Sequence, residues 1–158
     1  MPLVRRLLIV HTNDIHGRVE ALTRAATLVD RVRAENPDAA VVYLDAGDVE
    51  ETTSRLSSLT KGVAMHRLLD AAGCRAVAVG NGAVLRYGVE VLAEQAAAVP
   101  YPHLAANLFR DGQLVDGVQA RALLDVDGVR LGLIGLTPTG FGYIYEDIFG
   151  CERPPAVP

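Results

Sequence analysis

The pattern of apolar and polar positions over the first hundred residues alternates between two kinds of segment. Continuous apolar runs, typical of strands buried on both faces of a sheet, occur three times, at residues 7–10, 40–44 and 76–79. Each run precedes a stretch with apolar residues at helical spacing, at residues 19–36, 63–72 and 89–98. Strands that alternate with helices predict βαβ units with right-handed crossovers, and therefore a parallel sheet.

The pattern changes in the last third of the chain. Residues 103–108 predict a fourth strand, which the turn sequence Asp111-Gly112 follows. Two further apolar segments, 121–126 and 129–136, flank Asp127-Gly128, a pair typical of the tight turn in a β-hairpin. We therefore expect an α/β fold in which a βαβαβ arrangement is followed by a β-hairpin.

Polar residues follow each of the three apolar runs. Asp14 and His16 come after the first run, Asp48 after the second and Asn81 after the third. The carboxyl ends of parallel strands meet at one edge of the sheet, which is where open α/β sheets bind ligands. Asp14 and His16 are two positions apart, so in an extended segment their side chains point to the same side.

These four residues are of the types that bind hard or borderline divalent metal ions. Asp48 can bridge two ions, and Asn81 offers a neutral carbonyl oxygen. Two ions about 3.5–4 Å apart can clamp a phosphate and activate a water molecule. Single Asp and Asn residues in loops more often serve turns and helix caps, so the metal interpretation depends on their joint placement after three strands.

Composition and charge narrow the class of protein. The 158 residues are 50% hydrophobic and 22% charged, which is typical of a soluble globular domain with one core. A net charge of -4 argues against a nucleic-acid polymer as partner. A small phosphate-bearing substrate is still compatible, because bound metal ions can supply positive charge locally.

The same features give expectations about cellular location. The apolar run at residues 7–10 is too short to cross a membrane and lacks a cleavage site, so we expect no membrane partner. We expect either a cytoplasmic protein or the mature or trimmed form of a longer one. Cys74 and Cys151 have no metal-binding spacing, and two free thiols in a reducing compartment are favoured over a disulfide.

Several ordered motifs resemble the 5′-nucleotidase branch of the calcineurin-like metallophosphoesterases. They are His-Thr-Asn-Asp-Ile-His-Gly-Arg at 11–18, Leu-Asp-Ala-Gly-Asp at 44–48 and Val-Gly-Asn at 79–81. Leu-Thr-Lys-Gly at 59–62 and the apolar segment 129–137 are similar to a helix and a later strand of that family. The resemblance spans nearly the whole chain and implies the amino-terminal half of a layered α/β sandwich.

The resemblance also implies an activity and a ligand set. Asp14 and His16 would bind a first metal ion, Asp48 would bridge, and Asn81 would bind a second ion. The metals expected for the family are Mn, Fe, Zn or Mg. The implied reaction is hydrolysis of a nucleotide or small phosphate ester by metal-activated water. Arg18 would help to hold the phosphate, with a solvated loop arginine as the alternative.

The chain departs from the family pattern at two points. Gly82 and Ala83 stand where the family has a histidine, commonly followed by glutamate, and no Gly-His-x-His element occurs. The alternative function is therefore a degenerate family member that binds a metal ion or a nucleotide without turnover. Two ions are expected for the family, with one or none as the alternative for this chain. A flavodoxin-like or response-regulator-like module would explain the alternation of strands and helices. It would not explain Asp-x-His followed by Gly-Asp and Gly-Asn.

The remaining histidines supply no second ligand pair. We expect His11 to lie along a strand, His66 to be solvated on a helix, and His103 to be structural at the start of a strand. We also expect residues 1–158 to form one truncated domain, because the family's fold needs a second sheet. If the chain is complete, we expect a homodimer to cover the open half of the fold.

Overall fold

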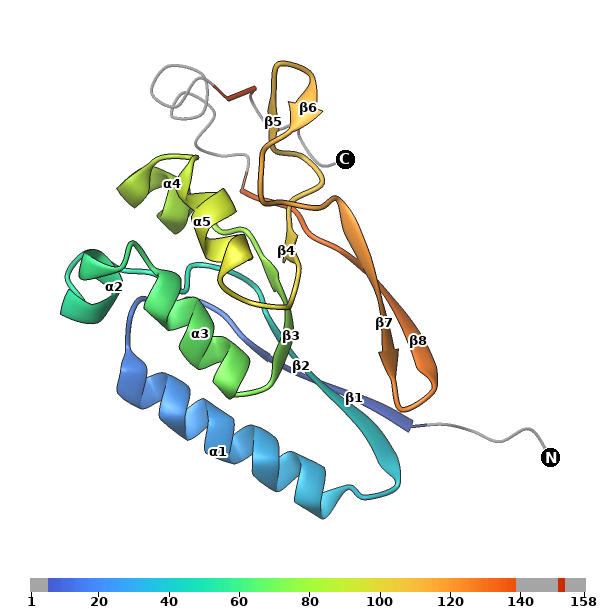
Figure 1. Cartoon of the computed structure of the whole chain (residues 1–158). Helices are drawn as coiled ribbons and strands as arrows, with labels where there is room; N and C mark the ends of the chain where they lie inside the picture. Colours follow the sequence, from blue (N-terminus) through green and yellow to red (C-terminus); the bar gives the residue numbers. More distant parts are fainter. Residues whose placement is uncertain (1–5, 139–150, 153–158) are drawn as a thin grey trace.

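The computed structural model of the protein describes residues 6–138 and 151–152. At its centre is a four-stranded sheet with the strand order β1-β2-β3-β4 (Figure 1). The strands are β1 (Arg6–Thr12), β2 (Ala39–Asp45), β3 (Cys74–Ala78) and β4 (His103–Leu104). Every neighbouring pair in this sheet is parallel, which confirms the predicted α/β architecture.

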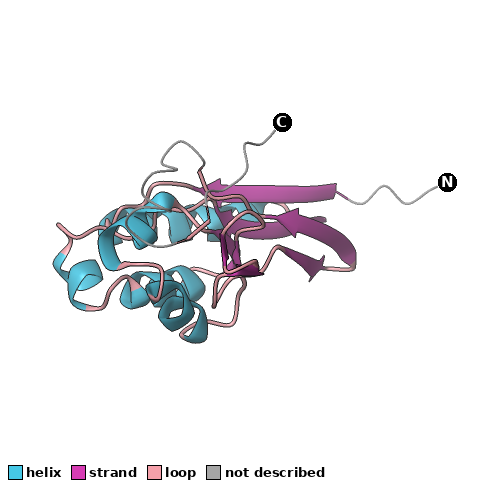
Figure 2. Ribbon diagram, turned by 90° about the horizontal axis from the view of Figure 1, so that it is seen from above, coloured by secondary structure: helices cyan, strands magenta, loops and turns pink. Residues whose placement is uncertain are grey.

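Helices and hairpins are arranged in layers around the sheet. In the described residues the helices are α1 (Val19–Glu35), α2 (Arg55–Leu59), α3 (Val63–Ala71), α4 (Asn81–Tyr87) and α5 (Val91–Ala97). The hairpins are β5 (Phe109–Arg110) with β6 (Gln113–Leu114), and β7 (Arg121–Val126) with β8 (Val129–Ile134). The helices gather on one side of the sheet and the β7–β8 hairpin lies on the other (Figures 1 and 2).

The alternation of side chains along β2 explains these layers. Tyr43 is fully buried against the helical side, in a cluster with Val29 of α1 and Leu69 of α3. Its neighbour Val42 points the other way and packs with Val126 of the hairpin. Successive side chains of a strand point to opposite faces, so one apolar run serves two cores. The buried strand predicted over 40–44 is confirmed.

The hairpin covers only part of the second face of the sheet. Ile9 of β1 is 50% exposed, and Ile134 of β8 is 74% exposed. An apolar groove of about 290 Å³ lies between them and the ends of β2 and β3. The expectation that the first strand is buried on both faces is therefore wrong, because β1 is an edge strand that the short hairpin leaves open.

Several element boundaries differ from the sequence prediction. The predicted fourth strand is short, since β4 has only two residues. Residues 81–87 form α4, although the sequence predicted a polar loop after the third strand. Helix α2 lies within residues 52–58, which are rich in Ser and Thr and show no helical pattern in the sequence. Glycine flanks Asn81 on both sides, a combination typical of turns, and tertiary packing of Val84 overrides this local preference.

The long helix and the second hairpin agree with the sequence. Helix α1 begins at Val19 as predicted and ends at Glu35, two residues before Pro37. In the hairpin turn, Asp127 and Gly128 both have positive φ, as the expected two-residue turn requires. The predicted α/β order of βαβαβ followed by a hairpin is confirmed.

The prediction that His66 is solvated is wrong. Its side chain is buried, with Nε2 2.6 Å from Oε1 of Glu50 and Nδ1 3.0 Å from the Tyr101 hydroxyl. The position lies on the face of α3 that also carries Leu69, three residues on, and this face packs against the sheet. His103 is buried beside it, with ring centroids 4.5 Å apart, as expected of a structural residue.

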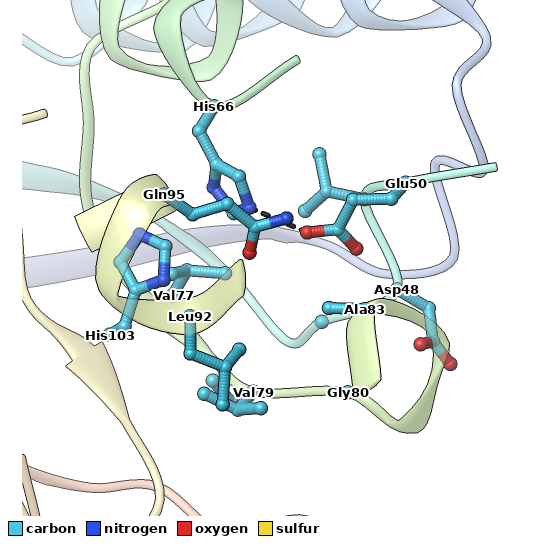
Figure 3. Close-up of a pocket in the computed structure, with 13 residues that line it drawn as sticks. Asp48, Glu50, His66, Val77, Val79, Gly80, Ala83, Leu92, Gln95 and His103 are labelled. Carbon is cyan, nitrogen blue, oxygen red and sulfur yellow. Dashed lines mark hydrogen bonds and ion pairs between the residues drawn. The ribbon is translucent and has the colours of Figure 1, made fainter. Parts of the chain in front are cut away.

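A small cavity lies beside this buried pair. Its volume is about 10 Å³, room for about one water molecule, and its lining includes Glu50, His66, Gln95 and His103 (Figure 3). Among the described residues, Oε1 of Gln95 and Nε2 of His103 have no hydrogen-bond partner. The cavity is thus lined by polar groups in an otherwise apolar interior.

Three smaller expectations can also be compared with the structure. None of the described helices is long and apolar enough to cross a membrane. Cys74 and Cys151 are both buried and are not joined in a disulfide, as expected. His11 lies in β1 and is exposed, in agreement with its assignment to a strand.

Candidate metal centre

The loops that follow β1 and β2 run side by side and hold the candidate ligands together. The backbone N–H of Asp14 donates to the carbonyl of Gly47 at 3.0 Å, and that of His16 donates to the carbonyl of Asp48 at 3.0 Å. These bonds continue the parallel pairing of β1 with β2 beyond the ends of the strands. The first and second motifs are therefore joined by backbone contacts, independently of any ligand.

All three candidate ligands in these loops have left-handed backbone conformations. The φ angles are 55° at Asp14, 49° at His16 and 54° at Asp48. This conformation costs a non-glycine residue roughly 1–2 kcal/mol. Such strain persists where the surrounding structure imposes it, and it clusters at functional sites.

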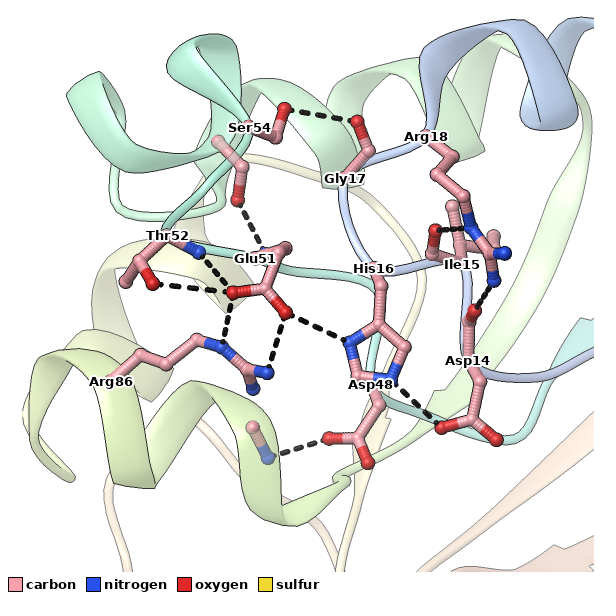
Figure 4. Close-up of polar contacts among 12 residues, drawn as sticks. Asp14, Ile15, His16, Gly17, Arg18, Asp48, Glu51, Thr52, Ser54 and Arg86 are labelled. Atoms are coloured by element: carbon pink, nitrogen blue, oxygen red, sulfur yellow. Dashed lines mark hydrogen bonds and ion pairs between the residues drawn. The ribbon is translucent and has the colours of Figure 1, made fainter.

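The side chains of the same three residues converge. One ligand atom from each of Asp14, His16 and Asp48 lies within 4.8 Å of the others. Nε2 of His16 is 3.2 Å from Oδ1 of Asp14, and the two side chains are 32% and 51% exposed (Figure 4). Two carboxylates and an imidazole, open to solvent on one side, are a donor set suited to a divalent metal ion.

The second nitrogen of His16 faces a carboxylate that the sequence did not single out. Nδ1 lies 3.5 Å from Oε2 of Glu51, which Arg86 binds through Nε at 3.2 Å and Nη2 at 2.8 Å (Figure 4). The guanidinium of Arg86 lowers the pKa of Glu51 to about 2. Nδ1 forms no hydrogen bond with the described residues at this distance, and Nε2 is the nitrogen of His16 that is directed to the cluster.

Asp48 is held from the opposite side by α4. The backbone N–H of Gly82 donates to Oδ1 of Asp48 at 2.5 Å. Burial raises the pKa of Asp48, and this hydrogen bond acts in the opposite direction. Asn81, the fourth candidate ligand, precedes Gly82 at the first position of α4 and is half-buried. The backbone thus brings Asn81 to the same sheet edge as the other three residues.

Two glycines allow this close approach of loops. A Cβ atom on Gly47 would lie 2.8 Å from the backbone nitrogen of Gly80, and Gly47 has a φ of +110°. A Cβ atom on Gly80 would lie 2.5 Å from the backbone nitrogen of Asp48. Real Cβ atoms do not approach backbone atoms so closely, so glycine at these positions is a steric requirement of the site.

Known proteins are similar to this chain in both sequence and fold. No protein-family model matches the chain. The 5′-nucleotidase of Mus musculus is 29% identical over 178 residues, covering 94% of this chain and 30% of the mouse protein. The crystal structure of a 5′-nucleotidase precursor from Thermus thermophilus has a TM-score of 0.72 at 29% identity, covering 84% of this chain and 29% of that one.

The chain belongs to the 5′-nucleotidase-like calcineurin-like metallophosphoesterases. It matches the amino-terminal portion of that family and spans less than a third of the length of the two relatives named above. A third structure, the sulfate thiohydrolase SoxB of Thermus thermophilus, covers 99% of the chain with a TM-score of 0.73 at 14% identity, a likeness of fold alone. The expected family and fold class are confirmed.

Arg18, expected at the substrate phosphate, makes contacts within the first motif of the chain. Its Nε donates to the carbonyl of Ile15 at 2.9 Å, and Nη2 donates to the carbonyl of Asp14. These bonds brace the loop in which Asp14 and His16 adopt positive φ. The contacts of Arg18 in the described structure are thus with the backbone of the loop that carries the candidate ligands Asp14 and His16.

Behind the site, Asp45 is buried at the end of β2. It accepts hydrogen bonds from Oγ1 of Thr12 at 2.5 Å and from the backbone N–H of Gly47 at 2.8 Å. Burial raises the pKa of Asp45 to about 6 despite these bonds. Asp45 connects β1 to the turn that carries Asp48, so it supports the site from inside the protein.

The comparisons also bear on the expected location of the protein. They give no support to the cytoplasmic location expected from the sequence. In the structure Gly82 is buried in α4, and its backbone N–H donates to Asp48. Sequence analysis did not identify Glu51 or Arg86, and the only signal for Glu51 is an acidic residue three positions after Asp48.

Proposed function

We propose that the protein is a metal-dependent phosphoester hydrolase that acts on a nucleotide or a similar small phosphate ester. The observation that carries this proposal is the convergence of Asp14, His16 and Asp48 within 4.8 Å at the carboxyl edge of the parallel sheet. The relatives named 5′-nucleotidase support the class of substrate.

Each residue has a distinct part in this proposal. Asp14 and His16 would hold one divalent ion, Asp48 would be shared with a second, and the amide oxygen of Asn81 would serve the second ion. Bound ions supply positive charge for the phosphate and a water molecule activated for attack. Glu51, 3.5 Å from Nδ1 of His16, would accept the Nδ1 proton when the site is loaded, so that Nε2 would be available to the metal.

Hydrolysis of 4-nitrophenyl phosphate in manganese buffer tests the proposal. We expect turnover by the purified protein and a loss of at least about 100-fold in Asp48→Ala, because removal of even an outer-shell partner costs 10–100-fold. Asp111→Ala is the matched control, since Asp111 also has positive φ but lies in the β5–β6 turn. Equal activity of wild type and Asp48→Ala would contradict the proposal.

A second candidate function is a non-catalytic metal- or nucleotide-binding protein. Gly82 favours it, because this position offers no acid or base to the leaving group. Loss of one positioned acid or base typically lowers the rate by about 10²–10⁴-fold. Metal binding that requires Asp48, combined with no hydrolysis of any phosphate ester, would favour this candidate over the hydrolase.

A further inference from the structure

The side chain of Arg86 extends back over the first turn of α4 toward the candidate metal centre. Arg86 lies four residues after Gly82, and positions four apart in a helix lie on the same face. Its side chain is only 21% exposed and is held by Glu51 through Nε and Nη2. Glu51 in turn faces His16, so Arg86 is tethered to the loop of the candidate ligands (Figure 4).

The third nitrogen of this guanidinium occupies the space that a side chain at position 82 would fill. A Cβ atom on Gly82 would collide with Nη1 of Arg86, and it would lie 2.6 Å from Oδ1 of Asp48. Nη1 and the Asp48 carboxylate therefore flank the same point in space. Among the interactions in the described residues, Glu51 uses Nε and Nη2, whereas Nη1 has no hydrogen bond.

We propose that Arg86 is a phosphate-binding residue that replaces the side chain missing at position 82. Its Nη1 donates a hydrogen bond to an oxygen of the phosphate bound beside Asp48. Glu51 is the positioning residue, because it holds the guanidinium through Nε and Nη2. This inference rests on the proposed function, because it places a phosphate at the same site. A guanidinium suits the role, since it is always charged and forms strong hydrogen bonds with phosphate oxygens.

The substitution has a chemical consequence for the class of substrate. Arginine does not give up its proton in proteins, so Arg86 stabilises negative charge but cannot protonate a leaving group. Phosphate compounds whose leaving group is already stable as an anion, such as aryl esters and phosphoanhydrides, do not need that proton. The preferred substrates are therefore phosphoanhydrides and aryl esters, with alkyl phosphates hydrolysed more slowly.

An ion pair that serves stability alone would not explain this arrangement. Exposed Arg–Glu pairs contribute little to stability, and Arg24 with Glu20 on α1 is such a pair in this chain. Arg86 differs from Arg24 in being partly buried and in pointing a spare nitrogen at the space beside Asp48. Because Gly82 has no side chain, Nη1 of Arg86 can occupy this position beside Asp48.

Calorimetric titration of inorganic phosphate into the manganese-loaded protein tests the inference directly. We expect Arg86→Gln to weaken phosphate binding by about 10-fold or more, the scale of one charge-assisted hydrogen bond. Arg86→Lys keeps the positive charge but lacks the planar guanidinium. Its phosphate affinity is expected to lie between those of Arg86→Gln and wild type. Arg24→Gln, which removes a helical arginine with its own ion pair, is expected to bind phosphate like wild type.

Two further measurements separate this role from a structural one. The manganese affinity and the melting temperature of Arg86→Lys are expected to stay near wild type, and the wild-type rate is expected to be higher for aryl than for alkyl phosphates. Unchanged phosphate affinity in Arg86→Gln, with manganese bound as in wild type, would overturn the inference and leave the proposed function intact. A wild-type protein that binds no manganese would overturn both.

Discussion

The backbone N–H of Gly82 and the Oδ1 atom of Asp48 are joined by a 2.5 Å hydrogen bond. This bond fixes a candidate metal ligand from the second motif against the helix that follows the third motif. The ligand is thus oriented by backbone that needs no particular side chain at position 82. The absence of a side chain at position 82 therefore leaves the orientation of this candidate ligand in place.

Glu51→Gln is expected to weaken manganese binding by about 10–100-fold, the typical effect of losing a carboxylate behind a metal-binding histidine. Glutamine cannot form the ion pair with Arg86, and it no longer favours the proton on Nδ1 of His16. Calorimetric titration with manganese measures the effect. Glu94→Gln, which removes an exposed carboxylate paired with Lys61, serves as the control and is expected to bind like wild type.

Gly47→Ala is expected to lower the free energy of unfolding by about 2–4 kcal/mol, from left-handed strain together with overpacking against Gly80. Gly112→Ala is the matched control, because Gly112 also has positive φ but has nothing within 4 Å of the added methyl group. Its expected cost is about 1 kcal/mol. Urea denaturation compares them, and equal losses would show that the close approach of the loops is unimportant.

Asp45→Asn is expected to stabilise the metal-free protein above pH 6 and to have little effect near pH 4. The pKa of Asp45 rises from 3.8 to about 6 on folding, chiefly through burial. The folded state therefore binds more protons than the unfolded state between these values, and the free energy of unfolding falls as the pH rises. The amide oxygen still accepts from Gly47, while the Thr12 hydroxyl can accept from the new N–H group.

His103→Phe is expected to reduce the loss of stability in acid. The pKa of His103 falls from 6.5 to about 2 on folding, chiefly because its side chain is buried. Below pH 6.5 the unfolded chain therefore takes up a proton that the folded protein does not. The free energy of unfolding of the wild type therefore falls as the pH decreases below 6.5. Phenylalanine keeps the stacking on Tyr101 and cannot titrate. Identical pH profiles between pH 6.5 and 4 would contradict this explanation.

The sequence predicted the parallel sheet and three of the converging ligands because both depend on local pattern. Apolar runs define the strands, and Asp14, His16 and Asp48 follow them directly. The contact between Glu51 and Arg86 was not predictable in this way, because it joins residues 35 positions apart with no shared periodicity.

The two clearest errors of the prediction from sequence, at the start of α4 and at His66, have related physical causes. Helix α4 begins within Gly80-Asn81-Gly82, where local preference favours a turn and packing against Asp48 and the core decides otherwise. His66 stands next to an arginine in the sequence, which suggested a solvated face. Its partners Glu50 and Tyr101 come from distant segments, so the interior polar network becomes visible only in the folded structure.

The stoichiometry of manganese binding, in wild type and in Asp48→Asn, tests the central claim most directly. Asparagine keeps an oxygen that can accept from Gly82 but removes the charge that bridges two ions. We predict two ions per wild-type chain, and a variant that folds normally but loses at least one of them. A wild-type chain that binds no manganese, or an Asp48→Asn variant with unchanged stoichiometry and affinity, would contradict a metal centre at Asp14, His16 and Asp48.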